Sequence, residues 1–449
     1  MKLINKSAYY YFALVAFVSA LVYFEFIYDV YPADEVSFFS MASPSEGNEK
    51  LTSLLYGLNA PDSVSNIQDW GYEKKISEIG GAAVNKFNRA AESSGKGREG
   101  NPFEAEINIK FIDGPYHHLC WQPSGEAYKN NCINRNDLSE LLVSNEMILS
   151  RYEKLITDQE NNFDTYLNLR ASLIEISKQL SIKIWLKKES MSHDDLKLVS
   201  WFLYFWKSVI DNSYLDGVDF NVALVNYGIA IRLFHSTVLR YPQILNLYRK
   251  SFGEFEPLPI EQSLMDRIAI ADFLMIDKTL CLRERFEANT TRSKCNESID
   301  LAFLKQGRTI RLMYDIRPQI SQCNYLEKLE NIELIDSPWV KIKALARPGN
   351  YIGRLYALGI FVKPGSICSS INAYKFYNEL FGLYQLYLNL KSLGYTEADI
   401  DEIKRSDPAL FKIPNSTDYY EWNSSTKAII LRREGPYGEK IYSLPYSYE

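Results

Sequence analysis

The feature that most constrains this chain is an uncharged apolar run near its start. Ala8 to Phe24 contains seventeen residues, none of them Asp, Glu, Lys or Arg. At about 1.5 Å per residue, such a helix spans roughly 25 Å, near the short limit for crossing a bilayer. A helix of a globular core would carry polar residues at helical spacing, whereas here only Ser19 interrupts the middle. We therefore expect residues 8–27 to form a transmembrane anchor.

Charged residues on either side of this run predict its orientation. Lys2 and Lys6 precede it, whereas Glu25 and Asp29 follow it. The positive-inside rule then places residues 1–7 in the cytoplasm and the rest of the chain across the membrane. A cleaved signal peptide is the alternative, because residues 18–20 (Val-Ser-Ala) form an acceptable cleavage site. Hydrophobicity continues past that site, which favours the uncleaved anchor.

The cysteines agree with an exported domain. There are six, an even number, and none lies in the anchor. Exported domains commonly carry disulfides, although six cysteines allow fifteen pairings and the sequence does not choose among them. The simplest hypothesis joins nearest neighbours, and in the cytosol the same residues would be free thiols. These pairs would be Cys120–Cys132, Cys281–Cys295 and Cys323–Cys368.

Apolar spacing predicts a mainly α fold beyond the anchor. We expect a connector over 28–65, a mainly helical domain over 66–405 and a small C-terminal β element over 406–449, with an isolated strand at 103–111. The predicted strands of the tail are 419–422, 428–431 and 440–444. The predicted helices are 66–92, a segment starting near 137, then 163–187, 194–211, 218–238, 260–286, 298–318 and 369–393.

A second apolar segment, at 196–210, raises the question of a second membrane span. Lys197 and Lys207 lie inside it, and the uncharged run between them has nine residues. Nine residues are too few to cross a bilayer. The segment is interpreted as a buried helix of a bundle.

Tests for metal and cofactor motifs are negative. His117, His118 and Cys120 are the best metal candidates, but adjacent histidines do not readily share one ion and Cys120 has a possible disulfide partner. From Asp211 to Asp219 the chain resembles a calcium loop, yet its fifth, sixth and twelfth positions are wrong, which favours a turn between helices. We expect no metal and no cofactor, and the sequence assigns no catalytic residue.

The remaining composition bears on partners. A net charge of −6 argues against nucleic acid, because phosphate binding needs a basic face. Aromatic residues are abundant, and such side chains fill cores, form interface hot spots or support sugars. Candidate sugar platforms are Trp121, Trp201, Trp206 and Trp422.

The C-terminal hundred residues resemble a set of uncharacterised bacterial envelope proteins. The matching elements are Asn350-x-x-Gly353-Arg354-Leu355, a long helix at 377–395, and Ile413-Pro414 ahead of a Tyr-rich hairpin. The hairpin departs from the usual pattern, because Asn-Ser-Thr stands at 415–417. The resemblance implies a single-pass inner-membrane protein with a periplasmic domain, and it carries over no catalytic residue.

Two functions are compatible with these observations. The first is an anchored scaffold or accessory subunit that binds another envelope protein. The alternative is an envelope enzyme or glycan-binding protein that acts on cell-wall material, for which a deep pocket with aromatic rings and two carboxylates would be expected.

Overall fold

The structure is a computed structural model that describes residues 14–20, 34, 37–39, 50–58, 60–61, 63–73, 135–159, 161–167, 169, 172–256, 262–280, 308–314, 364–414, 416–435 and 438–446. The chain divides into two units, which are described separately. The main unit comprises residues 46–213, 218–261 and 370–449. The second unit comprises residues 1–45, 214–217 and 262–369.

Part of the predicted anchor is described. Residues 14–20 are helical, and Leu14, Val15, Phe17 and Val18 are exposed. Among the residues that the structure describes, no helix combines the length and the apolar character needed to cross a membrane. The other residues of the 8–27 segment lie outside the described ranges, and the anchor therefore stays a prediction.

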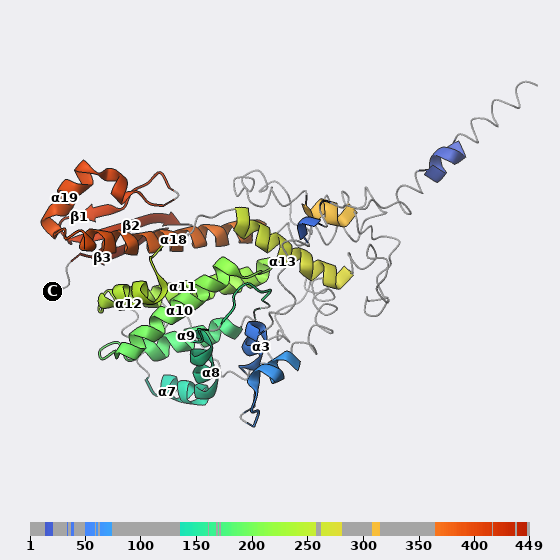
Figure 1. Ribbon diagram of the computed structural model, residues 1–449, viewed down its shortest axis with the longest axis horizontal. Helices are drawn as coiled ribbons and strands as arrows, with labels where there is room; N and C mark the ends of the chain where they lie inside the picture. Colours follow the sequence, from blue (N-terminus) through green and yellow to red (C-terminus); the bar gives the residue numbers. More distant parts are fainter. Residues whose placement is uncertain are drawn as a thin grey trace, which may run out of the picture. The chain divides into compact units, whose positions relative to one another are not determined.

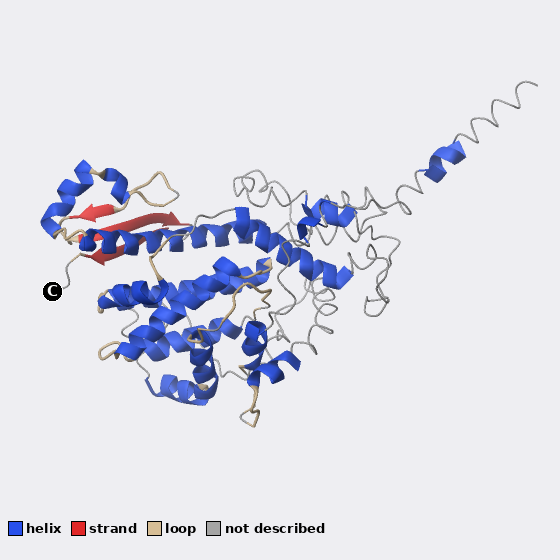
Figure 2. Ribbon diagram, viewed as in Figure 1, coloured by secondary structure: helices blue, strands red, loops and turns tan. Residues whose placement is uncertain are grey.

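The main unit is largely helical and ends in a small antiparallel sheet (Figure 2), which confirms the expected fold class for this part of the chain. Its helices are α3 (Lys50–Gly57), α7 (Arg135–Ser144), α8 (Glu146–Ile156), α9 (Ser172–Trp185), α10 (His193–Asn212), α11 (Gly217–Val238), α12 (Gln243–Phe252), α18 (Pro364–Ser392), α19 (Glu397–Ser406) and the 3-10 helix η6 (Pro408–Phe411).

Helix α10 is the buried bundle helix that the sequence predicts. A capping box starts it, in which Ser192 and Asp195 bond each other's backbone N–H groups. Its uncharged stretch supplies core residues such as Phe202 and Trp206, both fully buried. The Trp206 Nε1–H donates to the Tyr152 hydroxyl at 2.8 Å. This bond satisfies the one polar atom of the indole and joins α10 to α8.

The helix predicted from residue 137 is in fact two helices. The helical conformation is interrupted at Asn145, between α7 and α8, where φ is −109° and ψ is 10°. The Asn145 Nδ2 donates to Gln179 Oε1 at 2.9 Å, and both residues are buried. An apolar pattern does not show this break, because the partner of Asn145 lies 34 residues away on α9.

The predicted boundaries of two other segments also differ. Helix α9 begins at Ser172 rather than at 163, and described residues from 161 to 169 form turns and an isolated bridge. Asn162 and Asp164 form a local turn there, since the Asp164 N–H donates to Asn162 Oδ1 at 2.9 Å. Helix α3 lies inside the expected connector, and its Leu51 is buried.

Helix α18 organises the C-terminal half of the main unit. From residue 371 on it lies between the sheet and helices α11 and α12 (Figure 1). Phe381 contacts Tyr248 of α12 at 6.0 Å between ring centroids, and Phe376 contacts Tyr442 of the sheet at 5.2 Å. A helix with neighbours on two sides must be apolar around most of its circumference. This explains why α18 lacks a polar stripe.

The sheet contains three strands in the order β1–β2–β3, all antiparallel. They are β1 (Glu421–Asn423), β2 (Ala428–Gly435) and β3 (Gly438–Pro445), which confirms the three predicted strands with shifted ends. The Asn423 side chain forms the first turn by accepting from the backbone N–H groups of Ser425 and Thr426. Lys427 then adopts a φ of 49°, which is uncommon outside glycine.

The second unit contains α13 (Gln262–Leu280) and a helical segment at 308–314, which fall within the predicted helices 260–286 and 298–318. Phe39 stacks on Phe273 with 4.0 Å between centroids. The Gly217 N–H donates to Asp272 Oδ1 at 3.0 Å. Burial raises the pKa of Asp272 well above its usual value, and the neighbouring carboxylate of Asp216 adds to this effect.

Several predictions fall outside the described residues. They concern the strand at 103–111, the histidines at 117 and 118, Trp121, the 350–355 element and five of the cysteines. The sixth, Cys368, belongs to α18, but its side chain is not among those described. The disulfide pairs therefore remain predictions.

Candidate functional site

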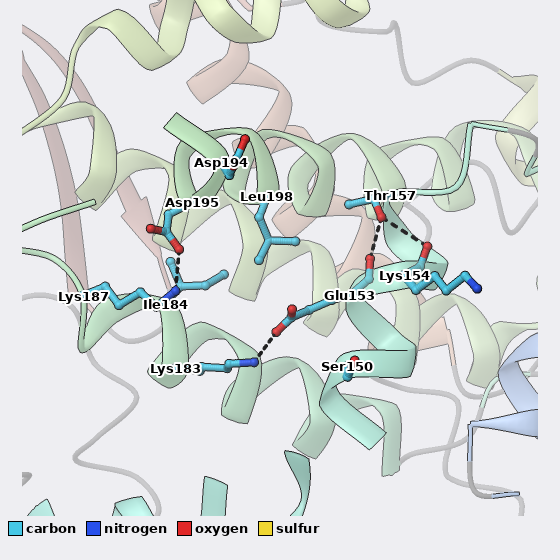
Figure 3. Close-up of a pocket in the computed structure, with 10 residues that line it drawn as sticks. All are labelled: Ser150, Glu153, Lys154, Thr157, Lys183, Ile184, Lys187, Asp194, Asp195 and Leu198. Atoms are coloured by element: carbon cyan, nitrogen blue, oxygen red, sulfur yellow. Dashed lines mark hydrogen bonds and ion pairs between the residues drawn. The ribbon is translucent and has the colours of Figure 1, made fainter. Parts of the chain in front are cut away.

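The main unit contains two candidate sites, and the first is an open groove of about 380 Å³ between α8, α9 and the start of α10 (Figure 3). Three lysines and three acids line it, together with hydroxyl groups and two apolar side chains. The lining residues are Ser150, Glu153, Lys154, Thr157, Lys183, Ile184, Lys187, Asp194, Asp195 and Leu198.

The charges of this groove largely neutralise one another. Lys183 Nζ lies 2.7 Å from Glu153 Oε1, and Lys187 Nζ lies 2.7 Å from Asp195 Oδ1. Burial works to raise the pKa of Asp195, but hydrogen bonds from Lys187 and Ser192 outweigh it and lower the pKa. A general acid needs a raised pKa. Asp195 therefore does not fit an acid–base role, and its contacts explain it as part of the α10 cap.

The four tryptophans proposed as sugar platforms lie in different environments. Trp206 is fully buried and bonded to Tyr152, which excludes it as a platform. Trp422 is half-buried and its ring contacts Tyr446 edge-on at 6.1 Å. Trp121 lies outside the described residues. Trp201 is half-buried on the outer side of α10, and it belongs to the second candidate site.

This second site is a cluster of half-buried rings that we call the aromatic face, comprising Phe163, Trp201, Tyr204 and Phe252. Trp201 and Tyr204 are three residues apart on α10, so they share one side of that helix. Neighbouring positions such as Phe202 and Phe205 point into the core instead. The helical period thus divides the aromatic residues of α10 between core and surface.

Helix α12 brings the fourth ring to the face. It packs against α10 and ends at Phe252, because Gly253 adopts a φ of 91° and donates its N–H to the Arg249 carbonyl. A glycine reaches this left-handed region without the penalty of a Cβ. The end of α12 therefore places the Phe252 ring against α10.

The rings contact one another closely. Tyr204 and Phe252 are stacked with 4.3 Å between centroids, and Trp201 meets Phe252 edge-on at 4.6 Å. Phe163 adds an edge contact to Tyr204 at 6.4 Å. Such pairs contribute about 0.5–1.5 kcal/mol each beyond area burial, so the rings hold one another in fixed positions.

Charged pairs flank the aromatic face. Lys197 lies one turn before Trp201, 3.8 Å from Asp194. Near Phe252, Arg249 Nε lies 2.6 Å from Glu254 Oε1. An aromatic centre with a charged and exposed rim matches the anatomy of protein interfaces. The arrangement can bury rings against a partner while the rim charges remain hydrated.

Sequence reasoning identified one member of this face, Trp201, and missed the other three. Phe163 was assigned to a helix that begins later, and α12 was not predicted at all. An amphipathic spacing at Ile244, Leu245 and Tyr248, ahead of Gly253, is the signal that could have revealed α12.

Histidines and metal ligands add no further site in the described ranges. His235 is buried with its Nδ1 3.1 Å from the Tyr384 hydroxyl, so it is a hydrogen-bonded histidine of the core. Asp211 lies in the last turn of α10 and the predicted helix-to-helix turn follows it. No group of three potential metal ligands occurs among the described residues.

Compared with known proteins, the chain matches no family model, no curated protein and no solved structure.

Proposed function

We propose that this protein is a membrane-anchored scaffold or accessory subunit whose outer domain binds another protein of the envelope through the aromatic face. The anchor is the apolar segment 8–27, oriented with its lysines in the cytoplasm. The main unit then lies in the periplasm of a bacterium, as the C-terminal resemblance implies. The partner is a protein rather than nucleic acid, in keeping with the net charge of −6.

The observation that carries this proposal is the packing of four half-buried rings into one cluster between α10 and its neighbours. Trp and Tyr are the residues most enriched among interface hot spots. Ring surface that stays in contact with water does not stabilise the fold, so folding alone does not explain aromatic residues on the outer side of α10. The rings of Trp201 and Tyr204 are also held by Phe252, so little side-chain entropy is lost when a partner covers them.

The experiment is recovery of the intact protein from membranes with its partner. Trp201→Ala and Tyr204→Ala are compared with the wild type, and the bound fraction is measured at several protein concentrations. A hot spot is worth about 2 kcal/mol or more, so we expect each variant to weaken partner binding by roughly thirtyfold. The matched control is Trp185→Ala, which removes a half-buried tryptophan from α9.

The outcomes separate the two functions. Loss with Trp201→Ala and retention with Trp185→Ala support the scaffold. Equal retention of the partner by both variants would contradict it. Binding of soluble peptidoglycan fragments that depends on Trp201 would instead favour the glycan-binding alternative.

A further inference from the structure

His235 of α11 lies where three elements of the main unit meet. Its Nδ1 is 3.1 Å from the hydroxyl of Tyr384 on α18, and its ring lies 5.1 Å from the ring of Tyr442 on β3, measured between centroids. The imidazole therefore joins α11 to both α18 and the sheet. Because His235 is buried, a charge on its ring has to be accommodated among these contacts.

The surroundings of His235 disfavour its protonated form. Burial lowers its pKa to about 4, and no described carboxylate counters this effect. The groups that face the ring from α18 and β3 are the phenols of Tyr384 and Tyr442, and phenols ordinarily lose their proton only near pH 10. On α11 itself, Arg232 donates its Nε–H to the Gly228 carbonyl and adds a like charge three residues before His235. Protonated His235 thus has no counter-ion among the described residues.

The contacts of the imidazole are weaker on the β3 side than on the α18 side. Tyr384 is fully buried, and its ring contacts those of Phe234 and Phe255, each at 5.4 Å. Tyr442 is half-buried and contacts the half-buried ring of Phe376 at 5.2 Å. Freeing Tyr442 therefore exposes less apolar surface than freeing Tyr384. Water reaches the imidazole with the smallest loss of packing when β3 moves.

Strand β3 lies at an edge of the sheet and pairs with β2 alone among the described strands. The Tyr446 N–H donates to the Lys427 carbonyl at 2.9 Å, one step beyond the Ala428–Pro445 pair. Hydrogen-bonded pairs alternate along an antiparallel ladder, so the N–H groups of Tyr442 and Leu444 are directed to β2. These two amides report whether β3 is attached to its neighbour.

We propose that His235 is an acid-sensitive switch, in which protonation of the imidazole detaches β3 from α11 and from β2. In the detached state water hydrates the imidazolium, so this state takes up a proton that the closed state does not. Its population then rises about tenfold for each unit of pH over which only the detached state is protonated. The inference does not depend on the proposed function, because no residue of the aromatic face takes part.

The test measures amide exchange in the full-length protein in detergent at pH 7.5 and pH 5. After correction for the intrinsic effect of pH on exchange, we expect the amides of Tyr442 and Leu444 to exchange about thirtyfold faster at pH 5. His235→Gln should abolish this acceleration, because glutamine can bond Tyr384 but gains no proton. The matched control is His193→Gln, which should retain the acceleration, since His193 is exposed at the start of α10.

The effect of urea separates local detachment from global unfolding. Exchange at Tyr442 should change little with low concentrations of urea, whereas exchange at Trp206 of α10 should rise steeply, because it requires much more surface to be exposed. Acceleration that persists in His235→Gln, or a urea dependence at Tyr442 as steep as at Trp206, would overturn the proposal.

A final readout needs no variant of the protein. The imidazole of His235 is titrated by NMR in the wild type, and we expect its midpoint well below the ordinary value of 6.5. A midpoint at 6.5 would also overturn the proposal, because the closed state would then take up the proton as readily as the detached state. A thermal melt verifies that each variant used in the exchange experiment is folded.

Discussion

The Tyr420 hydroxyl donates a 2.6 Å hydrogen bond to the Glu379 backbone carbonyl, directly over Gly382 of α18. The tyrosine lies at the start of the sheet, so this bond ties the sheet to the helix. A Cβ added to Gly382 would lie 2.4 Å from the hydroxyl and 3.0 Å from the Pro414 ring. The glycine is thus needed for the close approach of the two elements.

The first prediction concerns this contact. Gly382→Ala should destabilise the protein by about 1–3 kcal/mol, because the new methyl group forces the sheet away from α18. Tyr420→Phe should cost about 1 kcal/mol through the lost hydrogen bond. Urea unfolding measures both changes. The double variant should lose less stability than the sum of the losses in the two single variants. A loss equal to that sum would contradict a direct contact between the two residues.

The second prediction concerns Arg433, which binds Glu379 through two hydrogen bonds of 2.7 Å and also pairs with Asp418. Arg433→Met should destabilise the main unit by about 2 kcal/mol, because it leaves the half-buried carboxylate of Glu379 unpaired. Arg432→Met is the neighbouring control. Its pair with Glu421 is well exposed, so its loss should cost under about 0.5 kcal/mol. Similar costs for both variants in chemical unfolding would refute the account.

The third prediction concerns pH. Burial lowers the pKa of His235 to about 4 from an ordinary value of 6.5. Between these values the unfolded chain takes up a proton that the folded chain does not, so stability falls as pH drops from 6.5 to 4. A difference of this size amounts to roughly 3 kcal/mol.

The check is the free energy of unfolding from pH 7.5 to pH 4 in the wild type and in His235→Gln. The glutamine can bond Tyr384 but has no proton to gain. The wild type should lose roughly 3 kcal/mol more than the variant over this range. Parallel curves would show that His235 is protonated equally in both states.

The fourth prediction separates the two tryptophans of α10. Trp206→Ala should cost about 3–5 kcal/mol, because it leaves a cavity and removes the donor to Tyr152. Trp201→Ala should cost about 1 kcal/mol, since the half-buried ring is already partly hydrated. Thermal unfolding provides the comparison. A larger cost at Trp201 would mean that the aromatic face belongs to the core rather than to a binding surface.

Sequence patterns predicted the parts of this fold that depend on neighbours along the chain. The uncharged run between Lys197 and Lys207 identified α10 as a buried helix, and the pattern of the tail predicted its three strands. Features that depend on distant partners were missed. Asn145 at the break between α7 and α8 bonds Gln179 of α9, and the aromatic face depends on the packing of α12 against α10. The spacing of apolar residues along the chain does not indicate contacts between residues that are far apart in the sequence.

The central claim is that a partner protein covers the aromatic face. The most direct measurement is photocross-linking from position 204 in the intact protein in its membranes, with position 185 as the control site. We predict one predominant adduct with another envelope protein from position 204 and none from position 185. Equal adduct patterns from both positions, or no protein adduct from position 204, would contradict the account.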